Sequence, residues 1–251
     1  MRVTILGSGT AVPSAERFPA GVLVEGGGVR VVVDLGPGVL RRLAAVGVAP
    51  ESVDAVLLTH YHVDHCADVA ALLFALHAPD TTRPPLRIVG GPGLGRFLAG
   101  LRAAWPGWLE PRGYELREHE IAPGPFAVGG LEVTAHAIAH TAASLAYRLH
   151  EPETGAVAAI SGDATPCAGL VDVARGAHLF VCESAFPDAA PRAGHLTPRL
   201  AGEAAAAAGV ATLCLTHFYP ACEGHDVAAE ARRVFGGRVV AAHDLLRLEL
   251  P

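Results

Sequence analysis

Lysine is absent from the chain. All 19 basic residues are arginines, and with 25 acidic residues the formal net charge is −6. Proteins that bind nucleic-acid backbones use clustered lysines and arginines, and the sequence shows no such cluster. Arg41-Arg42 and Arg232-Arg233 are isolated pairs within expected helices, where solvated helix faces explain them. Nucleic-acid binding is weakened rather than excluded, because a fold can gather scattered arginines into one patch.

Three further absences narrow the class of protein. No uninterrupted run approaches 18 apolar residues, so we expect no membrane span. Residues 1–6 lead directly into a turn, without the basic head and apolar stretch of a secretory signal, and we expect a cytoplasmic protein. The cysteines are odd in number and form no Cys-x-x-Cys pair, which argues against a disulfide framework and against a thiolate zinc site. They are Cys66, Cys167, Cys182, Cys214 and Cys222.

No segment matches a nucleotide-binding loop. A P-loop needs a lysine, and after Gly7-Ser8-Gly9 the third glycine position of the dinucleotide fingerprint is occupied by Val12. A turn that lets the backbone approach another loop is the better interpretation of these glycines. The 251 residues, 51% of them hydrophobic, suffice for a full core, and we expect a single domain over residues 1–251.

Potential metal ligands are concentrated at positions 59–65. The segment Thr-His-Tyr-His-Val-Asp-His follows the apolar run 53–58 directly. In an extended segment alternate residues share a face, so His60 and His62 can point the same way, whereas Asp64 and His65 lie beyond a bend. This pattern suits two metal ions better than one. Imidazole and carboxylate ligands without thiolate favour Zn²⁺, with Mn²⁺ or Fe²⁺ as alternatives.

Three more candidate ligands follow hydrophobic runs elsewhere in the chain. His140 comes after the strand-like segment 131–139, Asp163 after 156–162, and His217 after 211–216. Short loops at the ends of rigid strands present side chains to solvent. We therefore expect these residues to join the cluster at positions 60–65.

The cluster resembles the metallo-β-lactamase superfamily, whose motif His-x-His-x-Asp-His is matched residue for residue at positions 60–65. The resemblance covers nearly the whole chain. It implies the fold, a four-layer αββα sandwich of the α/β (α+β) class in which two mixed β-sheets are flanked by helices. It also implies a ligand set, with His60, His62 and His140 on one metal ion, Asp64, His65 and His217 on the other, and Asp163 bridging the two.

Within this superfamily the chain is most similar to ribonuclease Z and its phosphodiesterase relatives. The glycine-rich turns at 6–13, 32–38 and 88–98 look like those of the family, and so do the segments 182–186, 195–197 and 215–218. The resemblance implies that His195 acts as the general acid for the leaving alkoxide and that Glu183 orients its ring. Together with Asp64, these two are the candidate catalytic residues.

Two departures from the family bear on the substrate. Where the family's second turn carries Glu between its glycines and Thr-Gln after them, this chain has Pro37 and then Val39-Leu40. Between His140 and Asp163 the common bacterial ribonuclease Z enzymes insert a long arm that grips transfer RNA. Here that interval has room only for a hairpin, 144–150 with 156–160.

We predict a dinuclear metal-dependent hydrolase, a phosphodiesterase of ribonuclease Z-like type that uses a metal-bridging hydroxide. The expected substrate is a small-molecule or single-stranded phosphodiester, with transfer RNA trimming as a special case weakened by the missing arm and the negative charge. Two alternatives stay open: hydrolysis of a thioester, lactone or other small-molecule ester, and a non-catalytic carrier or sensor. The acid pair argues against the first and seven intact ligands against the second. Relatives often pair, so a homodimer is also considered.

Coarse secondary structure completes the expectations. Helices are predicted at 68–78, 94–104, 199–209 and 226–235, with Asp68 and Asp226 as caps, and a hairpin around the glycines 26–28. Asp244, in the last turn, is a candidate for orienting a metal ligand. For Trp105 and Trp108 three roles are open, namely walling the substrate cleft, anchoring a dimer, or core packing.

Overall fold

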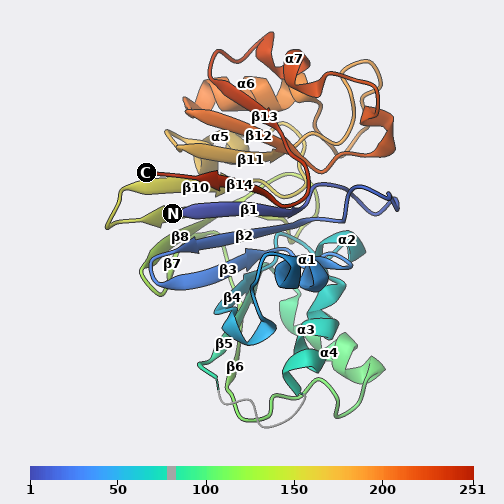
Figure 1. Cartoon of the computed structure of the whole chain (residues 1–251), viewed down its shortest axis with the longest axis vertical. Helices are drawn as coiled ribbons and strands as arrows, with labels where there is room; N and C mark the ends of the chain where they lie inside the picture. Colours follow the sequence, from blue (N-terminus) through green and yellow to red (C-terminus); the bar gives the residue numbers. More distant parts are fainter. Residues whose placement is uncertain (78–82) are drawn as a thin grey trace.

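The computed structural model describes residues 1–77 and 83–251. Two seven-stranded β-sheets pack against each other, and helices cover the outer face of each sheet (Figure 1). Both sheets contain parallel and antiparallel pairs. The predicted four-layer αββα sandwich with two mixed sheets is therefore confirmed. That residues 1–251 form one domain stays a prediction.

The first sheet has the order β14-β1-β2-β3-β4-β5-β6. Its outer face packs against α1, α3 and α4 through one apolar cluster. The strands are β1 (Arg2–Gly7), β2 (Gly21–Gly26), β3 (Val29–Val33), β4 (Ala55–Leu57), β5 (Leu86–Gly90), β6 (Leu116–Glu120) and β14 (Leu246–Glu249). The helices are α1 (Val39–Ala45), α2 (Val63–Cys66), α3 (Asp68–His77) and α4 (Leu94–Ala104), with a 3-10 turn η1 (Pro50–Ser52).

The second sheet has the order β13-β12-β11-β10-β9-β8-β7 and carries α5, α6 and α7 on its outer face. Its strands are β7 (Gly124–Val128), β8 (Leu131–Ala137), β9 (Leu145–Glu151), β10 (Ala156–Ile160), β11 (Leu179–Glu183), β12 (Thr212–Thr216) and β13 (Arg238–Ala241). Its helices are α5 (Ala168–Ala174), α6 (Pro198–Ala208) and α7 (Val227–Arg232), with a 3-10 turn η2 (Pro220–Cys222).

Alternating side chains explain how a sheet is buried on both faces. Along β2, Val22 and Val24 enter the core that contains residues of both sheets, while Leu23 points into the cluster shared with the outer helices. Successive side chains of a strand point to opposite faces, so an uninterrupted apolar strand can fill two cores at once. This two-sided burial of the strands accounts for the high apolar content of the chain.

Most expected elements are present, with shifted ends. The hairpin around the glycines is β2–β3, and Gly27 and Gly28 have φ of 56° and 74°, which a two-residue hairpin turn requires. Asp226 caps α7 by accepting from Ala229 N at 2.9 Å. The cap predicted at Asp68 is wrong. Asp68 follows α2 through the helical residue Ala67, so it does not stand at the start of a new helix. Its carboxylate instead accepts a hydrogen bond from Leu40 N at 2.9 Å.

The remaining differences are small. The helix expected at 68–78 is described as far as His77, because Ala78 lies outside the described residues. The helix expected at 226–235 already ends at Arg232. Within residues 1–77 and 83–251, no helix combines the length and the apolar character needed to cross a bilayer.

Loops at one edge of the sandwich position the candidate site. Strands β3 and β4 run parallel in the first sheet, as do β10, β11 and β12 in the second. The carboxyl ends of parallel neighbours meet at one edge, which is where side chains from different strands can converge. Four candidate residues follow these ends, His60 after β4, Asp163 after β10, Glu183 at the end of β11 and His217 after β12, and Asp34 lies likewise after β3.

Behind this edge, Tyr147 links the two sheets. It lies on β9, is fully buried, and its hydroxyl donates to Leu58 O on the first sheet at 2.8 Å. We predict that Tyr147→Phe lowers the free energy of unfolding by about 1–2 kcal/mol, because it removes a buried hydrogen bond. Tyr114→Phe is the matched control, since its buried hydroxyl makes no hydrogen bond with any described residue. Denaturant unfolding measures both, and equal effects would contradict the linking role.

Candidate metal centre

The segment 59–65 leaves β4, crosses an extended stretch and enters α2. His62 has φ −68° and ψ 148° and stands immediately before α2, whereas Asp64 and His65 lie within it. The bend expected between the two pairs is thus the start of a short helix. Side chains of a helix point in other directions than those of an extended segment. His60 and His62 therefore face one position, and Asp64 and His65 face a neighbouring one.

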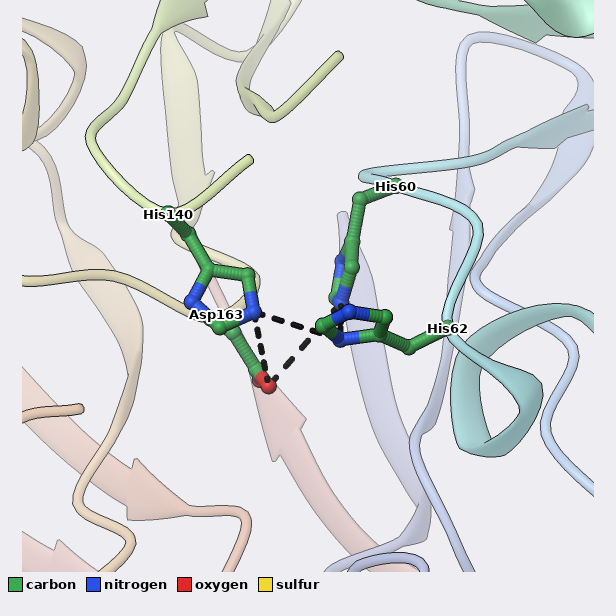
Figure 2. A group of neighbouring side chains, drawn as sticks. All are labelled: His60, His62, His140 and Asp163. Atoms are coloured by element: carbon green, nitrogen blue, oxygen red, sulfur yellow. Dashed lines mark hydrogen bonds and ion pairs between the residues drawn. The ribbon is translucent and has the colours of Figure 1, made fainter. Parts of the chain in front are cut away.

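The first group of donors comprises His60, His62, His140 and Asp163 (Figure 2). His60 Nε2 lies 2.9 Å from His62 Nδ1, and His140 Nε2 lies 3.2 Å from the same atom. Asp163 Oδ2 lies 3.9 Å from His60 Nε2 and 3.8 Å from His140 Nε2. Figure 2 shows these side chains converging, with His60 and His62 on one loop and His140 and Asp163 on two others.

The second group comprises Asp64, His65 and His217. His65 Nε2 and His217 Nε2 are 3.2 Å apart, and Asp64 Oδ2 lies 3.4 Å from His217 Nε2 and 3.9 Å from His65 Nε2. All three side chains are buried. His217 adopts φ 62°, a left-handed conformation that is uncommon for a residue other than glycine and is often found at functional sites.

Asp163 lies between the two groups. Its Oδ2 faces the first, and its Oδ1 is 3.2 Å from His65 Nε2 and 3.3 Å from His217 Nε2 in the second. Among the described residues this buried Oδ1 has no hydrogen-bond partner, so it is left for another positive group. Gly162 makes the approach feasible, since it has φ 63° and a Cβ there would lie 2.7 Å from Thr59 Cβ.

The donors fit divalent metal ions. In a tetrahedral zinc site ligand nitrogens lie about 2.0–2.1 Å from the ion and hence about 3.3 Å from one another, close to the spacings of both groups. Burial and the neighbouring His65 together lower the pKa of His60 to about 2, so the His60 ring is neutral and its lone pair is available. Burial also lowers the pKa of His62 and of His140.

Asp34 orients His65 and was not identified as a site residue from sequence. Its carboxylate accepts from Thr59 N and Thr59 Oγ1, each at 2.8 Å, and from His65 Nδ1 at 2.7 Å. With Nδ1 facing Asp34, Nε2 is the ring nitrogen that His65 presents to the second group. Asp34 is buried and has φ 63°. Its position in the Asp-x-Gly turn 34–36 is the sequence signal that could have pointed to this role.

Two other histidines are oriented by oxygen atoms. The Nδ1 of His140 donates to Gly194 O at 3.0 Å, and Nδ1 of His60 lies 3.0 Å from Thr59 Oγ1. Both contacts leave Nε2 facing the first group, as metal-binding histidines usually require. Because Gly194 directly precedes His195, the bond from His140 also anchors the loop that carries the candidate acid.

His195 and Glu183 form a pair beside the two groups. His195 Nδ1 lies 3.2 Å from Glu183 Oε1 and 3.8 Å from Asp163 Oδ2. Glu183 is held by backbone donors, accepting from Ala164 N at 2.6 Å and Leu196 N at 3.2 Å. Burial lowers the pKa of His195, but the hydrogen bond and charge of Glu183 outweigh it and raise the pKa above the usual value. The ring thus favours its protonated form.

Asp244 supports the site indirectly, through Ser8. Its Oδ1 accepts from Ser8 N and Ser8 Oγ at 2.9 and 2.8 Å, and its Oδ2 accepts from Phe18 N at 2.8 Å. Ser8 O in turn accepts from Phe218 N at 2.9 Å, next to His217. Asp244 therefore positions a metal-facing loop through Ser8 and does not itself touch a candidate ligand.

The structure brings all seven candidate ligands into two adjoining groups and places His195 and Glu183 beside them. His195, with Asp163 and His217, also forms a third set of donors that could hold an ion. Trp105 and Trp108 are not among the residues of any of the three sets. The role of core packing considered for them is wrong, because their exposed fractions are 49% and 57%.

Known proteins are similar to this chain over its whole length. Residues 29–218 match the family model described as the beta-lactamase superfamily domain. The chain is 32% identical over 278 aligned positions to Ribonuclease Z from Mycobacterium avium (strain 104), covering 100% of this chain and 98% of that protein. Ribonuclease Z from Mycobacterium marinum is 31% identical, covering 100% and 99%.

Solved structures give the same picture. The metallo-β-lactamase fold protein YhfI from Bacillus subtilis superimposes with a TM-score of 0.86 at 26% identity, and 98% of each chain is covered. The short form of human tRNase Z gives a TM-score of 0.82 at 24% identity, with 100% of each chain covered. At 24% identity, the similarity to human tRNase Z shows a shared fold only.

The contact from Asp34 to His65 can be tested through metal affinity. We predict that Asp34→Asn weakens binding of one of two divalent ions by about 10–100-fold, because the His65 ring loses the acceptor that fixes its orientation. Competition with a chromophoric chelator measures the affinity. The control is Asp172→Asn, an exposed carboxylate paired with Arg175 at 2.7 Å, which should leave affinity unchanged. Unaltered binding in Asp34→Asn would remove the orienting role.

Proposed function

Because the chain belongs to the metallo-β-lactamase superfamily, in its ribonuclease Z-like branch, we propose that it is a metal-dependent phosphodiesterase that hydrolyses RNA. The observation that carries the proposal is the arrangement around Asp163. Both groups of donors face this carboxylate, and His195, held by the buried Glu183, stands beside it. Such a site can activate water, neutralise a phosphoryl group and supply a proton to a leaving oxygen.

Seven residues would hold two divalent ions, most simply with the ligand division implied by the two groups and with Asp163 between them. We propose zinc, because imidazole nitrogen and carboxylate oxygen suit it and none of the donors is a thiolate. Such ions, when bound, lower the pKa of water toward 7 and stabilise negative charge on a phosphoryl oxygen. We count Asp64 among the catalytic residues because, as a ligand in the second group, it would fix the position of one ion.

The protein's own residues manage the proton. Glu183 accepts from His195 Nδ1, which keeps the ring protonated and leaves Nε2 as the atom that can donate. When water attacks phosphorus, the bond from phosphorus to the leaving oxygen breaks, and that oxygen takes the proton from His195 Nε2. The side chain of His195 is only 15% exposed, so its proton is directed to the bound substrate more than to solvent.

The substrate we propose is a single-stranded RNA end or another slender phosphodiester. Between His140 and Asp163 the chain forms only the turn at 141–144 and the hairpin β9–β10, so no arm extends toward a folded RNA body. The alignment with Ribonuclease Z from Mycobacterium avium spans 278 positions, whereas this chain has 251 residues, so the alignment contains positions that this chain lacks. A hollow of about 310 Å³ opens beside Asp64, with Arg17 as its only positively charged lining residue.

The role of His195 predicts a dependence on the leaving group. His195→Ala should lower turnover of an RNA substrate by about 100-fold or more, because a ribose alkoxide is a poor leaving group without a proton. Turnover of bis(4-nitrophenyl) phosphate should fall far less, since nitrophenolate leaves without one. Steady-state kinetics on both substrates, with metal content measured in parallel, give the comparison.

His119→Ala serves as the control, because this histidine is an exposed residue of β6 in the other half of the sandwich. It should match the wild type on both substrates. Equal losses on the two substrates in His195→Ala would mean that the ring positions the site rather than donating a proton. Wild-type turnover on RNA would remove His195 from the reaction.

Metal removal and a substrate panel test the proposed activity itself. Dialysis against a chelator should abolish hydrolysis, and about two equivalents of zinc per chain should restore it, because each donor group holds one ion. Restored enzyme is then assayed on a single-stranded RNA, a precursor transfer RNA, a cyclic nucleotide, a thioester and a lactone. Cleavage of RNA is expected. Activity confined to the thioester or lactone would overturn the proposal.

A further inference from the structure

Two aromatic rings stand beside the candidate acid and take no part in the proton transfer described above. Phe186 follows β11 and Tyr219 follows β12, and their rings stack with 4.6 Å between centroids and 17° between planes. Both side chains are half-buried. On the basis of the proposed function, we propose that Tyr219, backed by Phe186, stacks against the base of the nucleotide that carries the leaving oxygen and so selects nucleoside leaving groups.

The two rings lie where that nucleotide has to be. His195 can protonate the leaving oxygen only when this oxygen is within hydrogen-bond distance of its ring. The centroid of the His195 ring lies 5.7 Å from that of Phe186 and 5.8 Å from that of Tyr219. Tyr219 is also 6.0 Å from His217 between ring centroids. A nucleoside whose ribose oxygen meets His195 therefore has its base within reach of these rings.

Backbone hydrogen bonds hold the rings in place before a substrate arrives. Tyr219 N donates to Ala185 O at 3.1 Å, and Cys222 N donates to Tyr219 O at 2.9 Å. The first bond joins the loop after β12 to the loop after β11, so the segments that carry the two rings are fixed to each other. A ring that is already ordered loses little conformational entropy when a base stacks on it.

Tyr219 has a ring face that a base could use. It lines a hollow of about 170 Å³ formed mainly by residues of the loop 9–17 and of the segment 218–227. Phe186 covers one face of the Tyr219 ring and does not line this hollow. The opposite face of Tyr219 is therefore the one that can border the hollow and receive a planar group.

An ordered arginine lines the same hollow, together with Glu223. Arg17 Nη1 donates to Ser8 Oγ at 2.6 Å and to Ala242 O at 2.8 Å, and its guanidinium lies 4.8 Å from the centroid of the Phe218 ring. The other N–H groups of a guanidinium can bind a phosphate oxygen. Aromatic faces next to arginine are what proteins use to bind single-stranded RNA without reading its sequence. The presence of a base should therefore matter more than its identity.

Three dinucleotides distinguish stacking on a base from mere support of His195. One is adenylyl adenosine, whose products identify the nucleoside that carries the leaving oxygen, and each of the others lacks one of its two bases. Tyr219→Ala should lower kcat/KM for the complete dinucleotide by about 10–100-fold, the range expected for the loss of one base stack. For the analogue without the base on the leaving nucleoside, the wild type and Tyr219→Ala should be equally slow.

Three comparisons control this result. The analogue without the other base should lose as much in Tyr219→Ala as the complete dinucleotide does, because its leaving nucleoside still stacks. Tyr219→Phe retains an aromatic ring and should keep most of the activity. Phe74→Ala removes a 55% exposed aromatic side chain from α3, on the other sheet, and should keep the wild-type ratio between the substrates. Circular dichroism and metal content verify that the variants are folded.

An equal loss in Tyr219→Ala on the complete dinucleotide and on the analogue without the leaving base would overturn the inference. The ring would then support His195 or the fold. Wild-type kinetics of Tyr219→Ala on all three substrates would overturn it as well.

A failure of the proposed function would look different, namely as an absence of cleavage of RNA and of every dinucleotide. Where no dinucleotide is cleaved, the zinc-loaded protein is titrated with dinucleotides that carry the fluorescent base 2-aminopurine at either position. One of them should be quenched by the wild type and by Tyr219→Phe, but not by Tyr219→Ala. No quenching by the wild type, or equal quenching by Tyr219→Ala, would overturn the stacking role.

Discussion

A single carboxylate holds the candidate site together. Asp163 faces His60 and His140 through one oxygen and His65 and His217 through the other, in a place where solvent is nearly excluded. Two cations placed so close would repel each other strongly without a shared anion between them. Burial raises the pKa of Asp163, but the surrounding histidines lower it well below its usual value, so it remains an anion. Without Asp163, no side chain that the structure describes would contact both His60 and His140 of the first group and His65 and His217 of the second.

The rest of the edge keeps that carboxylate and its neighbours in place. Asp34 fixes His65 from one side, and Asp244 holds the loop next to His217 from the other. Asp34 and His217 both adopt left-handed backbone conformations, which cost free energy unless surrounding contacts compensate. Those contacts come from both sheets, because Tyr147 ties Leu58 of the first sheet to β9 of the second. Site geometry is thus coupled to the packing of the whole sandwich.

Residue type and spacing pointed to the histidines and aspartates that the structure brings together, and the resemblance to a known family supplied the expected fold. Histidines and aspartates directly after apolar runs identified both groups, since strand ends are where polar side chains can converge. What depends on three-dimensional contacts was less accessible. The capping role expected of Asp68 was wrong because its helix begins one turn earlier, at α2. Asp34 acts on His65 from 31 residues away along the chain; its Asp-x-Gly turn marks it as an unusual position, but the turn does not show which side chain the carboxylate contacts. The surroundings of the two tryptophans could likewise be known only after α3 and α4 were placed.

Anomalous diffraction from crystals of the protein loaded with zinc measures the central claim most directly. Data collected at the zinc edge should show two peaks, one on either side of the Asp163 carboxylate, each next to one group of histidines. A single peak, or two peaks that do not flank this carboxylate, would contradict the account of a shared anion between two ions.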